Sequence, residues 1–179
     1  MKRVLVVGTS GSGKTTTARR LAAVLDARHV ELDALFWNPG WEEADVPTFR
    51  ARVCDALDTP SWVACGNYWS KLRDMTWASA DTVVWLDLPV RTCRRRVVVR
   101  TLQRSLLRRD LWSGNRERLG DLWAADSLVR PLRARKRAFT ARYAGAAADT
   151  SFAHIEVVRL TSPAQVRRWM RQVSGAGAP

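Results

Sequence analysis

The sequence has few cysteines and no long hydrophobic run. Its three cysteines, Cys54, Cys65 and Cys93, are odd in number and include no C-x-x-C pair, which argues against a disulfide framework and against a zinc site. No stretch approaches the roughly 18 apolar residues that a membrane span needs. The apolar run at residues 4–7 is too short for the core of a signal peptide. We therefore expect a cytoplasmic protein without a membrane partner.

What the sequence has in excess is arginine. The 179 residues carry a formal net charge of +13, and nearly all of the positive charge is arginine. A basic excess favours polyanionic partners such as nucleotides, phosphorylated substrates or nucleic acid, and the planar guanidinium suits two-pronged contact with phosphate. A high arginine content can also reflect genome composition, so the charge alone does not identify a partner.

Strand-like and helix-like segments alternate along the whole chain. Apolar, β-branched runs predict five strands, at residues 4–7, 28–32, 61–65, 82–88 and 154–160. Helical segments are predicted at residues 14–26, from Pro47, at 68–79, 90–109 and 121–144, and from Pro163. The alternation predicts an α/β fold in three layers, a five-stranded parallel sheet with helices on both faces. We expect a single domain over residues 1–173, with a helical lid at roughly 105–137 and a flexible tail at 174–179.

One motif points to a specific chemistry. Residues 8–15 match G-x-x-x-x-G-K-[ST] between a predicted strand and a predicted helix, which is the context of a phosphate-binding P-loop. Glycines let successive N–H groups turn toward a phosphate, and the helix N-terminus adds partial positive charge. Lys14 can bridge the outer phosphates, and the Thr15 hydroxyl can bind Mg²⁺. We expect a P-loop NTPase fold that binds ATP–Mg²⁺ through Gly8, Thr9, Ser10, Gly11, Ser12, Gly13, Lys14, Thr15 and Thr16.

The candidates for an acceptor site are the residues that follow the other strands, because ligands of parallel sheets bind beyond the carboxyl ends of the strands. Asp33 follows the second strand, and its carboxylate could take a proton from a substrate hydroxyl or orient that hydroxyl for in-line attack. Gly66, Asn67 and Tyr68 follow the third strand and could bind the substrate. Arg73 could bind a substrate anion. For each of them a turn, a cap or a solvated surface position is the structural alternative.

Arginines recur at intervals of four along the predicted helix 90–109 and form one ridge. The ridge consists of Arg96, Arg100, Arg104 and Arg108. Its like charges would destabilise the helix by about 0.2–0.5 kcal/mol per pair unless an anion compensates. A triphosphate beneath a closing lid would supply that anion, and a solvated basic face is the alternative. In the lid, Arg116 could stabilise the transferred phosphoryl group, and Arg133 and Arg137 could do so from the other side.

These motifs together resemble the adenylate-kinase-like P-loop kinases, and most closely the bacterial proteins labelled "DNA topology modulation protein" or AAA-type ATPase. The matching stretches are residues 8–15, 32–41, 66–68, 83–89, 111–117 and 158–163. The resemblance covers the chain to about residue 172. It implies a five-stranded parallel core with a mobile lid, Asp33 on the acceptor side, and Arg96 and Arg100 at the base of the lid.

The sequence departs from this family after the third strand. The family reads Asp-Gly-Asn-Tyr there, and its Asp holds Mg²⁺ through water, whereas this sequence has Cys65. A neutral thiol does not replace a carboxylate around a hard cation. Either Asp33 or Asp87 compensates, or metal binding and turnover are weakened. We expect Thr15 and Asp87 to be the metal ligands.

The sequence therefore predicts an ATP-dependent phosphotransferase that moves the γ-phosphate to an unidentified nucleotide or other small molecule. The expected catalytic residues are Lys14, Asp33, Arg96, Arg100 and Arg116. Two alternatives stay open: a nucleotide-dependent regulator or nucleic-acid-binding protein, and a weakly active NTPase. The sequence contains no helix-turn-helix, zinc or RNA-binding signature that would favour the nucleic-acid alternative.

Overall fold

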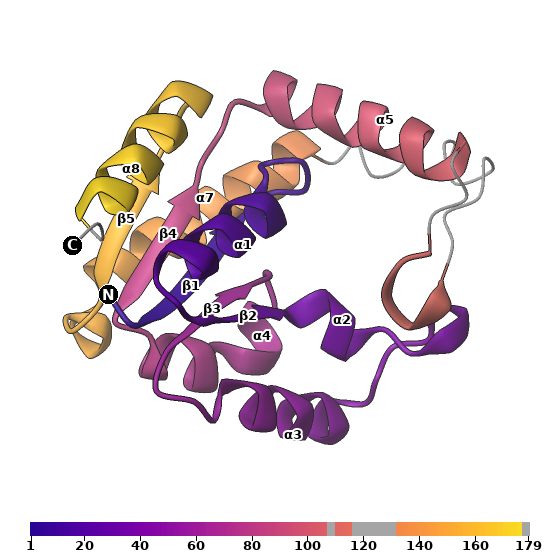
Figure 1. Cartoon of the computed structure of the whole chain (residues 1–179), viewed down its shortest axis with the longest axis horizontal. Helices are drawn as coiled ribbons and strands as arrows, with labels where there is room; N and C mark the ends of the chain where they lie inside the picture. Colours follow the sequence, from indigo (N-terminus) through magenta and orange to yellow (C-terminus); the bar gives the residue numbers. More distant parts are fainter. Residues whose placement is uncertain (107–109, 116–131, 177–179) are drawn as a thin grey trace.

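The computed structural model describes residues 1–106, 110–115 and 132–176. Five parallel strands form one sheet in the order β2-β3-β1-β4-β5, with β1 at its centre (Figure 1). The strands are β1 (Arg3–Gly8), β2 (Arg28–Glu31), β3 (Trp62–Cys65), β4 (Thr82–Leu86) and β5 (Glu156–Leu160). Each strand agrees with its prediction to within two residues at either end. The predicted α/β fold and its five-stranded parallel sheet are therefore confirmed.

Helices follow every strand. The α-helices are α1 (Lys14–Val24), α2 (Leu32–Phe36), α3 (Val46–Leu57), α4 (Trp69–Leu72), α5 (Val90–Leu106), α7 (Leu132–Ala148) and α8 (Pro163–Ala176). Short helical turns are η1 (Pro39–Trp41), the π-helical η2 (Arg73–Trp77), η3 (Trp112–Gly114) and η4 (Thr150–Phe152). Within the described parts of the chain, no helix is both long enough and apolar enough to cross a membrane.

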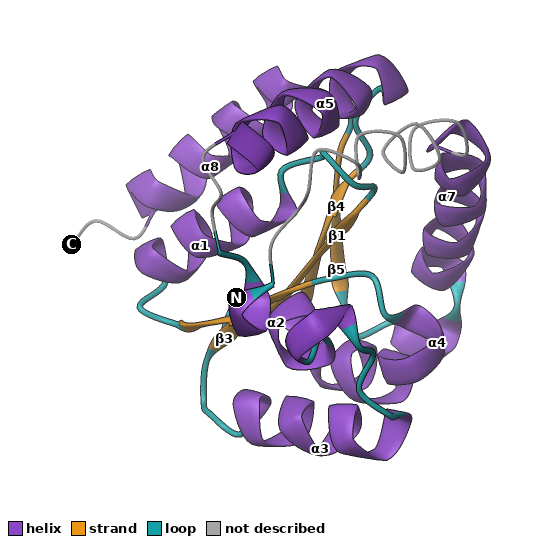
Figure 2. Cartoon of the chain, turned by 90° about the vertical axis from the view of Figure 1, so that its right-hand side faces the viewer, coloured by secondary structure: helices purple, strands orange, loops and turns teal. Residues whose placement is uncertain are grey.

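The sheet is buried on both faces, because alternate side chains of β1 enter two separate hydrophobic cores. Val4 and Val6 pack with α1 and α8 on one face, and Leu5 and Val7 pack with α3, α4 and α7 on the other. Figure 2 shows the sheet edge-on between these two layers of helices. The continuous apolar run of β1 is typical of a strand covered on both sides.

Besides small shifts at element ends, three features differ from the sequence prediction. The second strand ends at Glu31, one residue earlier than predicted, and Asp33 lies in the first turn of α2. The expected helix 68–79 is divided into α4 and the π-helical turn η2. Helix α8 continues to Ala176 because its apolar side keeps packing on the sheet through Val173, so the tail predicted from residue 174 begins as helix. Of the predicted lid 105–137, residues 107–109 and 116–131 lie outside the described residues.

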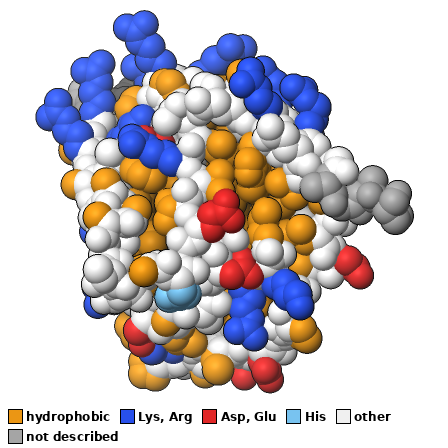
Figure 3. Space-filling view, turned by 90° about the vertical axis from the view of Figure 1, so that its left-hand side faces the viewer, with side chains coloured by type: hydrophobic (Ala, Val, Ile, Leu, Met, Phe, Trp, Pro, Cys, Tyr) orange, Lys and Arg blue, Asp and Glu red, His pale blue; other side chains and the backbone are white. Residues whose placement is uncertain are grey.

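The positive charge gathers around α5. Five arginines of this helix are exposed to solvent: Arg91, Arg94, Arg95, Arg96 and Arg100. Figure 3 shows one face of the molecule, with Lys and Arg side chains crowded at its top and hydrophobic side chains in its middle. Several exposed arginines therefore lie on the helix that adjoins the P-loop, where Arg96 donates to the carbonyl oxygen of Ser12.

Candidate active site

The P-loop joins β1 to α1, and each of its three glycines has a positive φ. Gly11 has φ +77°, and a Cβ atom there would lie 2.3 Å from the carbonyl oxygen of Cys93 in α5. Gly13 is the left-handed N-cap residue of α1 (φ 97°). Only glycine adopts these conformations without strain, and they turn the loop amides toward the N-terminus of the helix. The geometry is that of an anion-binding loop.

Lys14 lies folded over this loop. Its Nζ donates to the carbonyl oxygens of Gly8 at 2.8 Å and of Thr9 at 3.3 Å. Burial lowers the pKa of Lys14, and the nearby Asp33 carboxylate opposes that effect. Arg96 reaches the loop from α5, where its guanidinium donates to the carbonyl oxygen of Ser12 at 3.1 Å. Two cationic groups therefore meet at the loop, one from each side.

Asn67 fixes the beginning of the loop. Its amide accepts a hydrogen bond from the Gly8 N–H at 3.1 Å and donates one to the Gly8 carbonyl oxygen at 2.6 Å. The Tyr143 hydroxyl of α7 also donates to Asn67 Oδ1, at 3.4 Å. Both ends of the amide are thus engaged within the protein. Asn67, expected to bind substrate, instead holds the P-loop, and Gly66 is buried against Leu32, where an added Cβ would lie 2.9 Å from Leu32 Cβ.

A carboxylate lies beside the expected metal ligand Thr15, but it comes from β2. The Thr15 hydroxyl donates to Glu31 Oε1 at 3.0 Å, and the Cys65 Sγ lies 4.0 Å from the same hydroxyl. Glu31 and Cys65 are register partners on the adjacent strands β2 and β3. The carboxylate that the sequence lacks at Cys65 is therefore supplied one strand away. Sequence reasoning missed Glu31, although its position two residues before Asp33 was a usable signal.

The donor set around Thr15 fits Mg²⁺ bound largely by nucleotide and water. One hydroxyl and one carboxylate are hard oxygen ligands of the kind Mg²⁺ prefers, and the described residues contain no cluster of three or more His, Cys, Asp or Glu side chains that could hold a metal on its own. Burial, and after it the nearby Glu31 carboxylate, raise the pKa of the Cys65 thiol to about 12. Cys65 is therefore neutral and adds no charge to the site.

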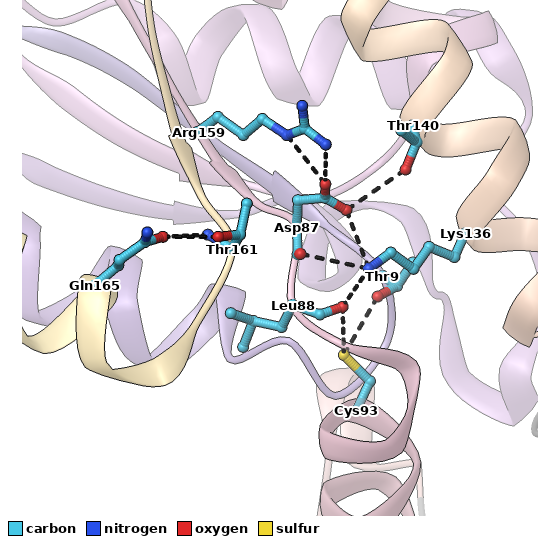
Figure 4. A network of polar contacts seen from close by, with 9 residues as sticks. All are labelled: Thr9, Asp87, Leu88, Cys93, Lys136, Thr140, Arg159, Thr161 and Gln165. Atoms are coloured by element: carbon cyan, nitrogen blue, oxygen red, sulfur yellow. Dashed lines mark hydrogen bonds and ion pairs between the residues drawn. The ribbon is translucent and has the colours of Figure 1, made fainter.

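Asp87, expected to bind metal, is committed elsewhere (Figure 4). Its carboxylate is 7% exposed and pairs with Arg159 of β5 at 2.6 Å and with Lys136 of α7 at 3.3 Å. Lys136 also donates to the carbonyl oxygen of Leu88 at 2.7 Å. Because two cationic side chains already pair with this carboxylate, it is not available to bind a metal ion. Asp87 therefore ties α7 and β5 to the end of β4, and the expectation of a metal ligand is not supported by its surroundings.

Asp33 is held by Tyr68. The tyrosine hydroxyl donates to Asp33 Oδ1 at 2.7 Å, and its ring packs against both Phe36 and Phe49, with ring centroids 4.8 Å from each. Burial raises the pKa of Tyr68 above its ordinary value, and Asp33 raises it further, so the phenol remains a proton donor. Tyr68 thereby orients Asp33 and is not itself among the described residues that line the cleft.

A cleft of about 720 Å³ connects the P-loop with Asp33. The expected residues that line it are Ser10, Gly11, Gly13, Lys14, Thr15, Thr16, Asp33, Arg96 and Arg100. Arg104 of the predicted arginine ridge also lines it, together with residues outside the expected catalytic and binding sets: Arg19, Glu31, Trp37, Trp41, Thr101 and Trp112. Lining residues come from the P-loop, β2 and helices that include α1, α5 and η3, so the cleft is built from segments far apart in the sequence.

Several expected residues lie away from this cleft. Arg73 stacks over the Trp69 ring, with 5.6 Å between its Cζ and the ring centroid. Arg133 and Arg137 are exposed on α7 and are not among the described lining residues. Arg116 lies outside the described residues. The described cleft therefore takes its arginines from α1 and α5.

A central parallel sheet, a glycine-rich loop with Lys14 and Thr15 before α1, and a cleft over that loop define a P-loop protein with a kinase-like fold. The family model described as "AAA domain" matches residues 4–119, and the chain belongs to this family. No curated protein matches the sequence.

Solved structures of kinases are among those similar to this chain. Shikimate kinase from Acinetobacter baumannii, in complex with shikimate, has a TM-score of 0.53 at 18% identity and covers 97% of this chain and 90% of its own. An unliganded sugar kinase from Janibacter sp. HTCC2649 has a TM-score of 0.44 at 17% identity. The alignment covers 98% of this chain and 91% of the sugar kinase. At such low identity the first likeness speaks for the fold alone.

Proposed function

We propose that the protein is an ATP–Mg²⁺-dependent phosphotransferase that moves the γ-phosphoryl group to a hydroxyl held at Asp33. The observation that supports this most directly is that Lys14, Thr15 and Asp33 line one cleft beneath Arg96 and Arg100. Phosphoryl transfer needs positioning and charge stabilisation more than covalent chemistry. A phosphate loop and an acceptor carboxylate that face the same cleft meet that need.

Each side chain has a defined role in this proposal. The loop N–H groups and Lys14 bind the outer phosphates, and Arg96 and Arg100 stabilise charge that develops during transfer. Tyr68 occupies Asp33 Oδ1, which leaves Oδ2 for the acceptor hydroxyl. As the hydroxyl oxygen bonds to the γ-phosphorus, its proton passes to Asp33. The bond from that phosphorus to the bridging oxygen breaks, and its electron pair leaves with ADP.

Thr15 and Glu31 are the residues that we propose for the metal. Bound Mg²⁺ would neutralise the outer phosphates, with the Thr15 hydroxyl as a direct ligand and Glu31 acting through water. Glu31 takes this role in place of Asp87, because its carboxylate already bonds to the Thr15 hydroxyl.

The base and ribose would extend along α5. A second groove of about 760 Å³ shares Arg96 and Arg100 with the cleft and is further lined by Arg91, Arg95 and Pro163. A guanidinium plane and a proline ring can sandwich a flat heterocycle. Arg96 and Arg100 line both, so the second groove lies beside the proposed phosphate site.

The test is phosphate transfer from labelled ATP in the presence of Mg²⁺ to a panel of nucleosides, nucleotides, sugars and small alcohols. We expect transfer to at least one acceptor, and a loss of about 10²–10⁴-fold in Asp33→Asn, the effect of removing a general base. Nucleotide affinity should be unchanged in this variant. Asp55→Asn, an exposed position on α3, is the matched control.

The exposed arginines of α5 keep one alternative in view, a nucleotide-dependent protein that binds nucleic acid. Salt-sensitive DNA binding without transfer to any acceptor would support this alternative and would overturn the phosphotransferase. Slow ATP hydrolysis, unaffected by every acceptor and by Asp33→Asn, would instead indicate a weakly active NTPase.

A further inference from the structure

Three tryptophans line the acceptor side of the cleft. Trp37 follows α2, Trp41 ends η1 and Trp112 begins η3, and each is only partly buried. The ring centroids of Trp37 and Trp41 are 5.6 Å apart, and those of Trp41 and Trp112 are 6.3 Å apart. Adjacent rings are nearly perpendicular, at 80° and 85°. We call these three residues the aromatic wall.

The aromatic wall is held in place by the residues around η3. Asn115 is 5% exposed; its Oδ1 accepts from the Trp41 N–H at 2.9 Å, and its Nδ2 donates to the Asn38 carbonyl oxygen at 2.8 Å. The Ser113 hydroxyl donates to the Trp37 carbonyl oxygen at 2.7 Å. Segments 74 to 77 residues apart are thereby joined through three hydrogen bonds to backbone.

This arrangement is maintained against backbone strain. Trp41 and Ser113 both have positive φ, 61° and 56°, a conformation that costs a side-chain-bearing residue about 1–2 kcal/mol. Such strain persists only where the surroundings enforce it, and it concentrates at binding sites. Simple core packing would bury the indoles and would not require these conformations.

The aromatic wall begins one helical turn from Asp33. The Trp37 N–H donates to the Asp33 carbonyl oxygen at 3.1 Å. This hydrogen bond closes the helical turn that separates the first indole from the proposed acceptor carboxylate. A cleft lined on one side by indoles and ending at a carboxylate suits a ligand with an apolar face and a hydroxyl group.

We propose that the acceptor is a ring alcohol, whose flat face packs on the aromatic wall while its hydroxyl bonds to Asp33. Nucleosides and cyclic sugars share this chemistry. The inference rests on the proposed phosphotransferase function and names the class of its acceptor. The reaction places the γ-phosphoryl group on the ring hydroxyl oxygen, with the hydroxyl proton on Asp33 and ADP as the leaving group.

The test compares ring alcohols with open-chain partners of similar size. Glucose is paired with sorbitol, and adenosine and thymidine form the nucleoside arm, each assayed by transfer from labelled ATP with Mg²⁺. We expect a ring alcohol to be phosphorylated with a kcat/KM at least about tenfold above that of sorbitol or glycerol. Which arm responds decides between sugar and nucleoside.

The aromatic wall is tested by Trp41→Leu and, separately, Trp112→Leu. Each should raise KM for the preferred acceptor about tenfold, in line with the loss of one stacked ring, and leave KM for ATP unchanged. Trp169→Leu, on α8, is the matched control. Two variants are used because Trp41 has a strained backbone, and thermal unfolding verifies that each variant is folded.

Three results would overturn the inference. The first is phosphorylation of sorbitol or glycerol with the same efficiency as the ring alcohols. The second is an unchanged KM for the acceptor in both tryptophan variants. Either result would contradict the ring-alcohol acceptor but not the phosphotransferase function. No transfer to any alcohol, ring or open-chain, would remove both.

Discussion

Replacing Asn67 with alanine tests how the P-loop is held. The substitution removes the acceptor for the Gly8 N–H and one of the two donors to the Gly8 carbonyl oxygen, which keeps its bond from Lys14 at 2.8 Å. A buried N–H left without a partner costs about 1–3 kcal/mol, and the second hydrogen bond contributes about 1 kcal/mol. We therefore expect Asn67→Ala to lower the free energy of unfolding by about 2–4 kcal/mol.

For a chain of this length, each kcal/mol corresponds to a change in Tm of about 2–4 °C, so Asn67→Ala should unfold roughly 5–15 °C below the native protein. Nucleotide affinity should fall as well. If 1.4 kcal/mol of the loss falls on the binding conformation of the loop, Kd for ATP rises tenfold. Thermal unfolding followed by circular dichroism, and titration with a fluorescent ATP analogue, measure the two effects.

Asn38→Ala is the matched control for this prediction. The Asn38 side chain accepts a hydrogen bond from Arg52 at 3.0 Å and does not contact the P-loop. Its loss should lower Tm by only a few degrees and leave Kd for ATP unchanged. A Tm within about 2 °C of the native value for Asn67→Ala, together with unchanged ATP binding, would refute the claim that this amide holds the loop.

Three further predictions concern charge and burial. Glu31→Gln should raise the Mg²⁺ concentration for half-maximal nucleotide binding about tenfold, and adding Cys65→Asp should restore it; equal Mg²⁺ titrations in all variants would contradict this. The pKa of Asp81 lies below its ordinary value because hydrogen bonds from Thr82 and from backbone N–H groups outweigh its partial burial. The stability that Asp81 contributes is thus present above about pH 4 and lost as the pH falls through its folded pKa, and Asp81→Asn should flatten acid unfolding measured below pH 4. At pH 8 an alkylating reagent should modify the exposed Cys54 quickly while Cys65 stays protected, which mass spectrometry reads out; fast labelling of both would be inconsistent with a buried thiol whose pKa is about 12.

The sequence by itself determined the elements and the phosphate loop. Apolar runs such as residues 4–7 are local patterns. A continuous apolar run is enough to predict a strand that is covered on both faces, without information from elsewhere in the chain. The loop from Gly8 to Thr15 is likewise contiguous, so residue types and spacing were enough to predict its position before α1.

Only the tertiary structure decided how the polar residues after the strands are used. Asp87 follows a strand and was expected to bind metal, but Arg159 and Lys136 surround its carboxylate. Asn67 also follows a strand and was expected to bind substrate, but its amide is hydrogen-bonded to the backbone of Gly8. These partners lie 49 or more residues away in the sequence. A strand-end position indicates that a side chain is near the cleft, but it does not show which neighbour the side chain contacts.

Strand pairing also explains why the sequence did not reveal Glu31 as the carboxylate that compensates for Cys65. The sequence showed that a carboxylate is missing after the third strand, and the parallel register of β2 with β3 placed Glu31 beside that position and beside Thr15. Trp37, Trp41 and Trp112 met in the cleft because Asn115 joins segments that the sequence separates by more than 70 residues. Local pattern therefore determined the nucleotide loop, whereas the metal-side carboxylate and the aromatic wall depended on strand pairing and long-range hydrogen bonds that no local pattern encodes.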